Sequence, residues 1–506
     1  MKDSTILEWL LAHELFSARA KKVRGKKSEP ARPLNQSLFE VMRGAIISGS
    51  VNPGQKLPSS RELTSGLGIS RNTVLYVFNR LTDEGYTTTA AGSGTFVSNT
   101  MPDPEMLKKV PDLTARPART SASNETSSIS RRAHMLMSRA GASEIQVGAF
   151  VPGIPDVSQF PTKIWSKLLA KQWKNVSAEQ MGYGSSLGYP PLKRAIAVYL
   201  RLARGIQCED SQLMITQGTH QALDLCGRLL ADVGDDVWIE DPCYWGARSV
   251  FLGAGLNLQP IPIDRDGMCP RTDGLTHPKL IFVTPSHQYP SGAVMSLARR
   301  RLLLEIARRN QAWIVEDDYD SEFRYSGAPQ PSLQGMDEHQ RTIYVGSLSK
   351  VMYPGLRLGF LVVPPQLVNV FAKMQSELYR GGQLTVQAAL AEFIFEGHYA
   401  AHIRRMRKVY GQRQSLLTSE IERQIGQQAY IMGTETGLHL TLGLRKANDV
   451  EVSQAALRRG IVARPLSGYY DKPTKAASGL VLGYGGVADE DIASSVGKLA
   501  AALSDV

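Results

Sequence analysis

The stretch IYVGSLSKVMYPGLRLGF, residues 343–360, contains two apolar runs separated by a polar segment. The first run, IYV, is predicted to be a buried strand, and the last residues, LGF, to begin another. Two serines, one lysine, a Pro-Gly turn and an arginine lie between them. Lys350 therefore follows the end of a buried strand, where poor hydration lowers the pKa of an amine and makes it a usable nucleophile.

The polar groups around Lys350 suit a phosphate. The hydroxyls of Ser347 and Ser349 can donate hydrogen bonds, and the guanidinium of Arg357 offers a planar pair of donors. An amine nucleophile beside a phosphate site favours pyridoxal 5'-phosphate (PLP), which binds to lysine as a Schiff base. Taken alone, Lys350 also fits a solvated lysine that follows a strand, so the choice depends on the rest of the chain.

The composition is that of a globular protein with more than one domain. A chain of 506 residues exceeds one ordinary core, and 42% hydrophobic with 21% charged residues is typical of soluble proteins. No apolar run approaches the ~20 residues of a membrane span, and a signal-peptide pattern is lacking, so we expect a cytoplasmic protein without a membrane partner. The four cysteines and nine histidines show neither a disulfide framework nor metal-ligand spacing, so no metal site is expected.

The net charge of +11 is concentrated at the front of the chain. Residues 1–141 hold 20 lysines and arginines against 12 aspartates and glutamates. A basic excess indicates a nucleic-acid partner, although residues 19–32 alone fit a solvated basic tail equally well. We expect residues 1–31 to form a basic, flexible extension.

Three helices and a hairpin are predicted between residues 34 and 98. Apolar residues recur at helical spacing from Leu38 to Ile46, with Val41 in the stripe, and SSRE at residues 59–62 is a capping box that opens a second, short helix. Ser70 caps a third helix with an apolar stripe formed by Val74, Val77, Phe78 and Leu81. Residues 86–97 place β-branched and aromatic residues around a glycine tip, which indicates a hairpin. A helix-turn-helix followed by such a wing is typical of DNA-binding domains.

Three segments in this region, GQKLPSSREL (54–63), SRNTV (70–74) and GSGTFV (92–97), resemble the winged-helix domain of GntR-type bacterial transcription regulators. The domain is expected at residues 32–98. The resemblance implies binding to double-stranded DNA, with Arg61 and Arg71 as principal contacts and Ser59, Ser70, Thr73 and Gly94 assisting. The alternative for Arg61 is a surface position on a helix.

Residues 99–141 are rich in serine, threonine, proline and arginine and have weak periodicity. This composition cannot bury a core and indicates a linker. Its arginines, among them Arg132 and Arg139, either contact DNA or keep the segment soluble, and we favour the second role.

Residues 142–506 alternate apolar strands with helical stretches, which predicts an α/β domain with a largely parallel sheet. Ligands of open α/β sheets bind beyond the carboxyl ends of the strands. At these ends, Gly218 and Thr219 open a helix and could seat a phosphate, and Tyr244 could stack on a flat cofactor. Asp317 follows another strand and could pair with a protonated pyridine nitrogen. Each signal has an alternative when taken alone: a common strand-glycine-helix turn, a core tyrosine and an acidic loop.

Six segments resemble, in order, fold type I PLP enzymes of the class I aminotransferase group: GYPPL (188–192), QGT (217–219), EDP (240–242), YPSG (289–292), DDY (317–319) and SLSK (347–350). By this resemblance Lys350 forms the Schiff base, Asp317 pairs with the ring nitrogen, Tyr319 bonds the ring oxygen and Tyr244 stacks on the ring. Gly218, Thr219, Ser347, Ser349 and Arg357 would hold the phosphate, and Tyr183 would reach the phosphate of a neighbouring subunit.

Two departures from that group concern the same site. YPSG at 289–292 lacks the asparagine that opens the motif in aminotransferases and would contact the ring oxygen. In LVLGY at 480–484, Val481 stands where the group carries an arginine that clamps the substrate carboxylate. Arg464 could replace that arginine or could be a surface residue.

The order of winged helix, linker and aminotransferase-like domain resembles the MocR/GabR group of bacterial regulators, as do HQY (287–289) and EDDYDSEF (316–323). This implies a homodimeric, PLP-dependent transcription regulator that senses a small amine, an amino acid or PLP through Lys350. We expect the protein to be a regulator rather than an enzyme, although it could retain residual transaminase-type chemistry. The alternatives are an active aminotransferase with a DNA-tethering domain, and a regulator that uses a PLP-free domain only for dimerisation.

Overall fold

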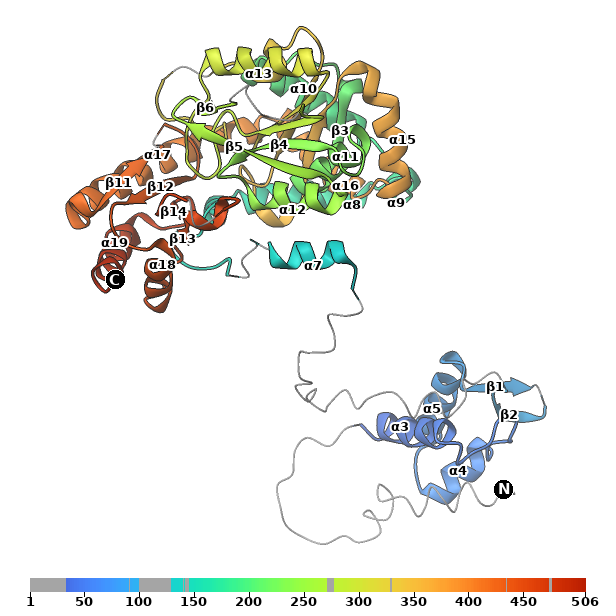
Figure 1. The fold of residues 1–506 in the computed structure, drawn as a ribbon. Coiled ribbons are helices and arrows are strands. Elements are labelled where there is room, and N and C mark those ends of the chain that lie inside the picture. The colour runs from blue at the N-terminus through green and yellow to red at the C-terminus, as the bar shows by residue number, and fades with distance from the viewer. Residues whose placement is uncertain are drawn as a thin grey trace. The chain divides into compact units, whose positions relative to one another are not determined.

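The computed structural model describes residues 33–90, 92–99, 129–139, 141, 145–270, 277–327, 330–433, 435–472 and 476–506. It forms two compact units, residues 1–124 and 125–506 (Figure 1), and each is described by itself. The basic extension predicted at residues 1–31 and most of the predicted linker lie outside the described residues. No helix in the described ranges has both the length and the apolar character needed to cross a membrane.

The smaller unit is the predicted winged helix. Its elements are α3 (Leu34–Ile47), α4 (Ser60–Leu67), α5 (Arg71–Asp83) and the antiparallel pair β1 (Thr87–Ala90) and β2 (Gly94–Val97). The apolar stripe predicted for α5 is buried, whereas on α3 Phe39 is fully buried and Val41 only half-buried. The guanidinium of Arg80 on α5 lies 3.9 Å from the centre of the Phe39 ring on α3, so the Arg80 side chain packs α5 against α3.

The larger unit is built around an eight-stranded sheet in the order β3-β10-β9-β8-β7-β4-β5-β6. The strands are β3 (Leu213–Thr216), β4 (Asp236–Asp241), β5 (Asn257–Asp264), β6 (Gly267–Met268), β7 (Leu280–Val283), β8 (Trp313–Asp318), β9 (Thr342–Ser347) and β10 (Gly359–Val362). Strands β5, β4, β7, β8 and β9 pair in parallel, and β10 runs antiparallel to β3 and β9. The predicted largely parallel sheet is confirmed.

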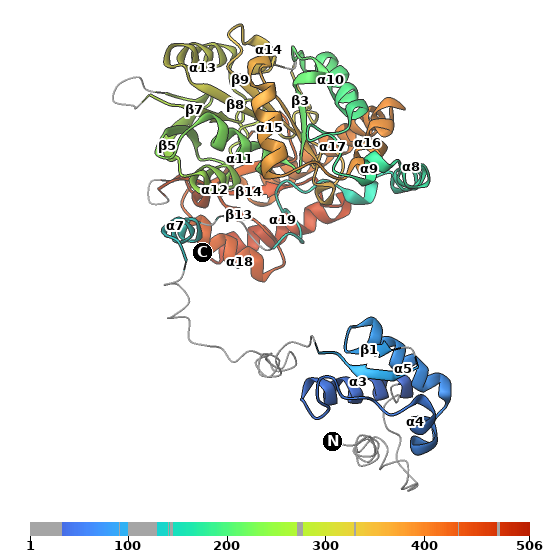
Figure 2. The same cartoon turned by 90° about the vertical axis from the view of Figure 1, so that its right-hand side faces the viewer.

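Helices cover both faces of this sheet (Figure 2). Val237 and Phe282 pack with α11 (Thr219–Leu230) and α12 (Trp245–Ala254), whereas their neighbours Trp238 and Ile281 pack with α13 (Leu297–Asn310) on the other face. Because successive strand residues point to opposite faces, a sheet buried on both sides requires continuous apolar runs. This is why the strands are readable in the sequence.

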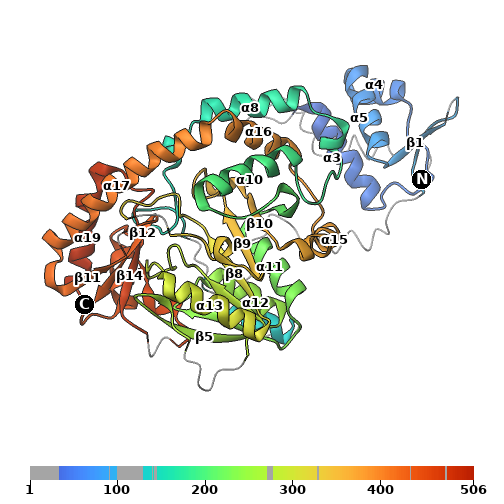
Figure 3. The same cartoon turned by 90° about the horizontal axis from the view of Figure 1, so that it is seen from above.

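The C-terminal part forms a second, antiparallel sheet in the order β11-β12-β14-β13. Its strands are β11 (Ala429–Met432), β12 (His439–Leu444), β13 (Arg464–Pro465) and β14 (Gly479–Gly483). Figure 3 shows the long helix α17 (His398–Gln424) and α19 (Asp489–Ser504) beside this sheet. The remaining helices are α8 (Thr162–Lys174), α9 (Ala178–Met181), α10 (Pro190–Arg204), α14 (Leu333–Met336), α15 (Val368–Leu378), α16 (Leu384–Phe395) and α18 (Asp449–Arg458).

Helix α7 (Arg131–Ser138) lies within the segment predicted as a linker, yet it packs against α12 of the larger unit. Arg132 donates to the carbonyl of Gly253 at 3.3 Å, and Arg139 pairs with Asp471 at 3.3 Å. These two arginines therefore contact the protein itself, a role that the sequence analysis did not consider. None of the α7 residues is buried, which explains the weak periodicity.

A buried ion pair joins α10 to the sheet. Arg204 donates to Asp318 at 2.6 Å, with the two side chains 8% and 1% exposed, and Tyr344 donates to the same carboxylate oxygen at 2.6 Å. We expect Arg204→Met to lower the free energy of unfolding by roughly 3–5 kcal/mol, because Asp318 would remain buried without its cation. Urea unfolding measures this. The exposed Arg194→Met on the same helix is the control, and equal stability of the two variants would contradict the expectation.

Candidate functional site

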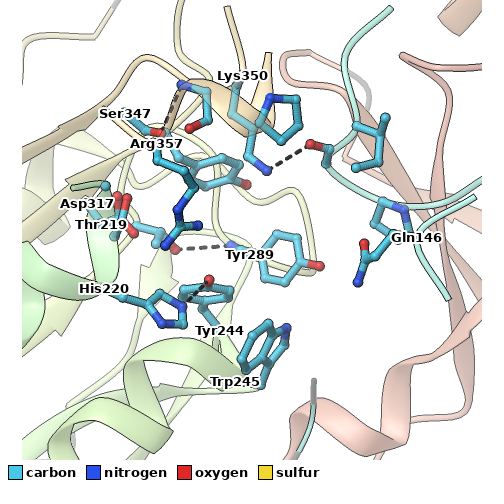
Figure 4. Close-up of a pocket in the computed structure, with 18 of the residues that line it drawn as sticks. Gln146, Thr219, His220, Tyr244, Trp245, Tyr289, Asp317, Ser347, Lys350 and Arg357 are labelled. Atoms are coloured by element: carbon cyan, nitrogen blue, oxygen red, sulfur yellow. Dashed lines mark hydrogen bonds between the residues drawn. The ribbon is translucent and has the colours of Figure 1, made fainter. Parts of the chain in front are cut away.

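Residues that follow the carboxyl ends of the strands line a cavity of about 330 Å³. The lining includes Gly218, Thr219 and His220 after β3, Tyr244 and Trp245 after β4, Tyr289 after β7, Asp317 and Tyr319 at the end of β8, Ser347 at the end of β9, and Ser349, Lys350 and Arg357 from the segment between β9 and β10. Figure 4 shows Lys350 and Arg357, from the connection between β9 and β10, and Tyr289, from the loop after β7, around this space. Nine of the ten predicted cofactor residues are thus brought together, and Tyr183 is not.

Lys350 follows β9 and points into the cavity. Its Nζ donates to the carbonyl of Gly153 at 2.8 Å. Burial lowers the pKa of Lys350, while the charges of Asp320 and Asp317 act in the opposite direction. A buried amine with a lowered pKa is more often unprotonated at neutral pH, which is the nucleophilic form.

Asp317 stands at the end of β8 with 4% of its surface exposed. Its Oδ1 atom is buried and has no hydrogen-bonding partner among the described residues. Burial raises the pKa of Asp317 to about 8, and the neighbouring charge of Asp318 adds to this. A buried carboxylate without a partner is costly, so the site suits a ligand that carries a protonated nitrogen.

The same cavity offers donors for an anion. Thr219 lines the cavity as the first residue of α11, and the first backbone N–H groups of a helix lack partners within that helix. Gly218 precedes it with φ +90°, a conformation that favours glycine. Ser347 and Arg357 add a hydroxyl and a guanidinium. Together these groups have the donor set of a phosphate site.

Three tyrosines line the same cavity and contact one another. The rings of Tyr244 and Tyr319 each meet Tyr289 edge to face, at centroid distances of 5.8 and 5.9 Å. Tyr244 also shares a hydrogen bond of 2.9 Å with His220, and the Tyr319 hydroxyl donates to the carbonyl of His287 at 2.9 Å. Tyr289 is the residue that replaces the expected asparagine, and it lines the cavity.

Several lining residues were not predicted. His220 directly follows Thr219 and Trp245 directly follows Tyr244, so the same sequence segments could have predicted them. Gln146 and the carbonyl of Gly153 come from a segment without any motif. Arg464, predicted only as an alternative, lines the cavity and pairs in β13 with Val481 of β14. The guanidinium therefore stands one strand away from the position where an arginine was expected, and Val481 itself is buried.

Tyr183 lies outside the cavity. It is 73% exposed, and the Arg380 guanidinium lies 4.9 Å from its ring centre. Its role at a neighbouring subunit remains a prediction.

In the smaller unit, Arg61 and Arg71 are exposed in the first turns of α4 and α5. Ser59 accepts from the N–H of Glu62 at 3.2 Å, and Ser70 accepts from the N–H of Thr73 at 3.1 Å, so both serines cap helices. Gly94 has φ +114°, and a Cβ atom there would lie 2.9 Å from the Lys56 side chain. The caps and the glycine account for the wing and helix geometry without DNA, and the DNA contacts remain predictions.

Comparison with known proteins matches both units. Residues 34–97 match the family "Bacterial regulatory proteins, gntR family", and residues 158–474 match "Aminotransferase class I and II". The chain is 37% identical to the probable rhizopine catabolism regulatory protein MocR of Rhizobium meliloti, over 93% of this chain and 94% of that protein. This chain belongs to the MocR-type family of transcription regulators.

Other MocR-type relatives cover the same length. The pyridoxine biosynthesis regulator PdxR of Corynebacterium glutamicum is 31% identical over 90% of this chain and 92% of that protein. Among solved structures, the kynurenine aminotransferase of Pyrococcus horikoshii has a TM-score of 0.68 at 24% identity and covers 76% of this chain and 99% of that chain. This likeness confirms a fold type I aminotransferase-like architecture for the larger unit of this MocR-type protein.

The buried carboxyl groups make stability depend on pH. Burial raises the pKa of Asp317 to about 8 and the pKa values of Glu240 and Glu322 to about 7. Because these values exceed the ~4 of an unfolded chain, the folded state binds more protons at intermediate pH, and its stability falls as the pH rises from about 4 and levels off above about 8. We expect Asp317→Asn to lose less stability than the PLP-free wild type between about pH 6 and pH 9. Thermal unfolding measures this, and equal losses would contradict it.

Proposed function

We propose that this protein is a PLP-dependent, DNA-binding transcription regulator that acts in the cytoplasm and senses a small amine, an amino acid or PLP at Lys350. The observation that carries this proposal is the half-buried Lys350 amine in one cavity with Asp317, in a chain that also contains a winged helix. The Oδ1 atom of Asp317 has no hydrogen-bonding partner among the described residues. PLP supplies an aldehyde that condenses with amines and a ring that withdraws electrons.

The residues of the cavity fit this cofactor. Asp317 would accept from the protonated ring nitrogen, which also removes the cost of its unpaired oxygen. Tyr244 would stack on the ring, and Tyr319 would bond the ring oxygen. Gly218, Thr219, Ser347, Ser349 and Arg357 would hold the phosphate. Tyr183 would reach the phosphate of a second subunit in a homodimer.

Regulation requires that the occupied and empty sites differ in their DNA-binding arrangement. A ligand shifts such a balance only as far as it prefers one state. A homodimer would present two winged helices to two half-sites of a double-stranded operator. Arg61 and Arg71 would contact the DNA, assisted by Ser59, Ser70, Thr73 and Gly94.

The experiment is a titration of the purified protein with PLP, followed by visible absorption and by borohydride reduction. We expect a visible band at about one PLP per chain and a reduced adduct on the peptide that contains Lys350. A protein that stays colourless with excess PLP would refute the proposal.

Arg464 is the cation that we propose for an effector carboxylate, because it lines the cavity and pairs with Val481 across the sheet. Its guanidinium donates to the backbone carbonyl of Ile145 at 3.1 Å. We expect Arg464→Ala to weaken binding of amino acids by roughly 10- to 100-fold, since a hydrogen bond to a charged group contributes about 1.5–3 kcal/mol. Binding of the corresponding amines, which lack the carboxylate, should change little. Spectral titration of the PLP-loaded protein measures both, and an equal loss for both ligands would contradict this role.

An active aminotransferase is the second candidate, supported by the nine predicted cofactor residues that line the cavity. Steady-state turnover with an amino donor and a keto-acid acceptor separates the two. Sustained turnover that is indifferent to DNA would favour the enzyme.

A further inference from the structure

The hydroxyl of Tyr319 contacts two atoms of His287. It lies 2.9 Å from the backbone carbonyl and 3.1 Å from Nδ1 of that residue. A carbonyl oxygen only accepts, so the phenol donates its hydrogen there. Because the single hydrogen of the phenol is used in this bond, the phenol presents its oxygen, an acceptor, to the cavity that Tyr319 lines.

His287 is itself fixed by a carboxylate. Its Nδ1 lies 3.0 and 3.1 Å from the two oxygens of Asp320, and both side chains are 1% exposed. Asp320 also accepts from the backbone N–H of Leu438 at 3.2 Å. Because a carboxylate only accepts, Nδ1 carries a hydrogen and can share it with the oxygen of Tyr319.

The other ring nitrogen agrees with this arrangement. Nε2 of His287 is buried and has no hydrogen-bonding partner among the described residues. A neutral ring with its hydrogen on Nδ1 leaves only an acceptor unpaired, which costs less than an unpaired charged donor. The ring is packed tightly: Tyr319 stacks at 5.8 Å and His439 lies at 4.5 Å between ring centres. Buried, connected hydrogen bonds of this kind hold side chains rigidly.

We propose that His287 and Asp320 are positioning residues that fix the place and the hydrogen-bond direction of the Tyr319 phenol, and thereby the affinity and spectrum of bound PLP. Neither residue is among the described residues that line the cavity, so His287 acts through Tyr319. Asp320 acts through His287, in addition to its charge, which also acts on Lys350. This inference rests on the proposed function of the site.

The same residues raise one competing explanation. His287, Asp320 and His439 form the group in the described part of the chain whose ligand atoms lie close enough, within 4.8 Å, to hold a metal ion. Their atoms have other partners, however: Nδ1 of His287 donates to Asp320, and Nε2 of His439 donates to the carbonyl of Pro290 at 3.1 Å. Metal analysis of the purified protein is therefore part of the test.

The test is PLP titration of the wild type, His287→Phe, Asp320→Asn and Tyr319→Phe, with affinity and the ratio of the visible to the near-ultraviolet band as readouts. Phenylalanine keeps a ring but removes Nδ1. Asparagine keeps the shape of Asp320 but turns a donor toward Nδ1. We expect both variants to bind PLP about 3- to 10-fold more weakly and to change the band ratio, because a hydrogen bond to the phenol is lost or reversed.

The double variant His287→Phe/Tyr319→Phe separates positioning from general damage. If His287 acts through Tyr319, His287→Phe adds no further change once the phenol is gone. An undiminished effect in that background, unchanged readouts in both single variants, or one metal ion per chain that His287→Phe loses would each overturn the proposal. If His287→Phe does not fold, His287→Leu, which also removes Nδ1, decides when it is measured alone and with Tyr319→Phe. A wild type that binds no PLP would refute the proposed function. If the wild type and the variants bind PLP with the same affinity and the same spectrum, only this inference is refuted.

Discussion

Lys350→Ala is expected to abolish covalent attachment of PLP. The amine that donates to Gly153 at 2.8 Å is the proposed nucleophile, and no other lysine lines that cavity among the described residues. After incubation with PLP and reduction with borohydride, mass spectrometry should find the adduct in the wild type and at background in the variant. This is the largest expected effect, because a covalent link is removed entirely.

Lys193→Met is the matched control. Lys193 is also a lysine whose pKa is lowered by burial, but it lies on α10 outside the cavity. This variant should retain the adduct at the wild-type level. An equal adduct in Lys350→Ala would contradict the assignment of Lys350.

Arg71→Ala is expected to give the second largest effect, on DNA binding. Arg71 is exposed at the first position of α5, behind the Ser70 cap, where the start of a recognition helix meets base edges. Loss of a base contact by arginine costs about 1–3 kcal/mol, so we expect roughly 5- to 150-fold weaker binding to the specific operator at fixed salt. Fluorescence anisotropy with operator and random duplexes measures the change.

Arg43→Ala provides the control for Arg71. Arg43 is in the same unit and pairs with Glu40 on α3 at 2.9 Å. The Arg43→Ala substitution removes the same charge from the unit, but Arg43 lies on a helix that is not expected to contact bases. A loss in Arg43→Ala equal to that in Arg71→Ala would indicate a general charge effect and contradict base recognition by Arg71.

The cavity could be predicted from the sequence because the chemistry lies at strand ends. Apolar runs such as Leu280–Val283 must form strands, since both faces of the sheet are buried. In a parallel sheet the residues after such runs meet at one edge, so Asp317, Lys350 and Thr219 were assigned to one site without coordinates. The winged helix was equally readable, because its caps and stripes are local patterns.

Contacts between distant segments could not be predicted. Nothing in the sequence near Gly153 indicates that its carbonyl meets Lys350, and Arg464 reaches the cavity only because β13 pairs with β14. Helix α7 was not predicted, because a helix that docks on the surface buries no apolar stripe and so lacks the pattern from which helices are predicted. The bond between His287 and Asp320 depends on the loops after β7 and β8 meeting, which neither motif specifies alone.

The central claim is that the cofactor site controls the DNA-binding unit, and operator affinity with and without PLP tests it most directly. The upstream region of the gene is the operator probe, at one salt concentration, with wild type and Lys350→Ala side by side. We predict that PLP changes the affinity or footprint of the wild type and leaves Lys350→Ala unchanged. Identical binding of the wild type in both conditions, with PLP covalently attached, would contradict the claim.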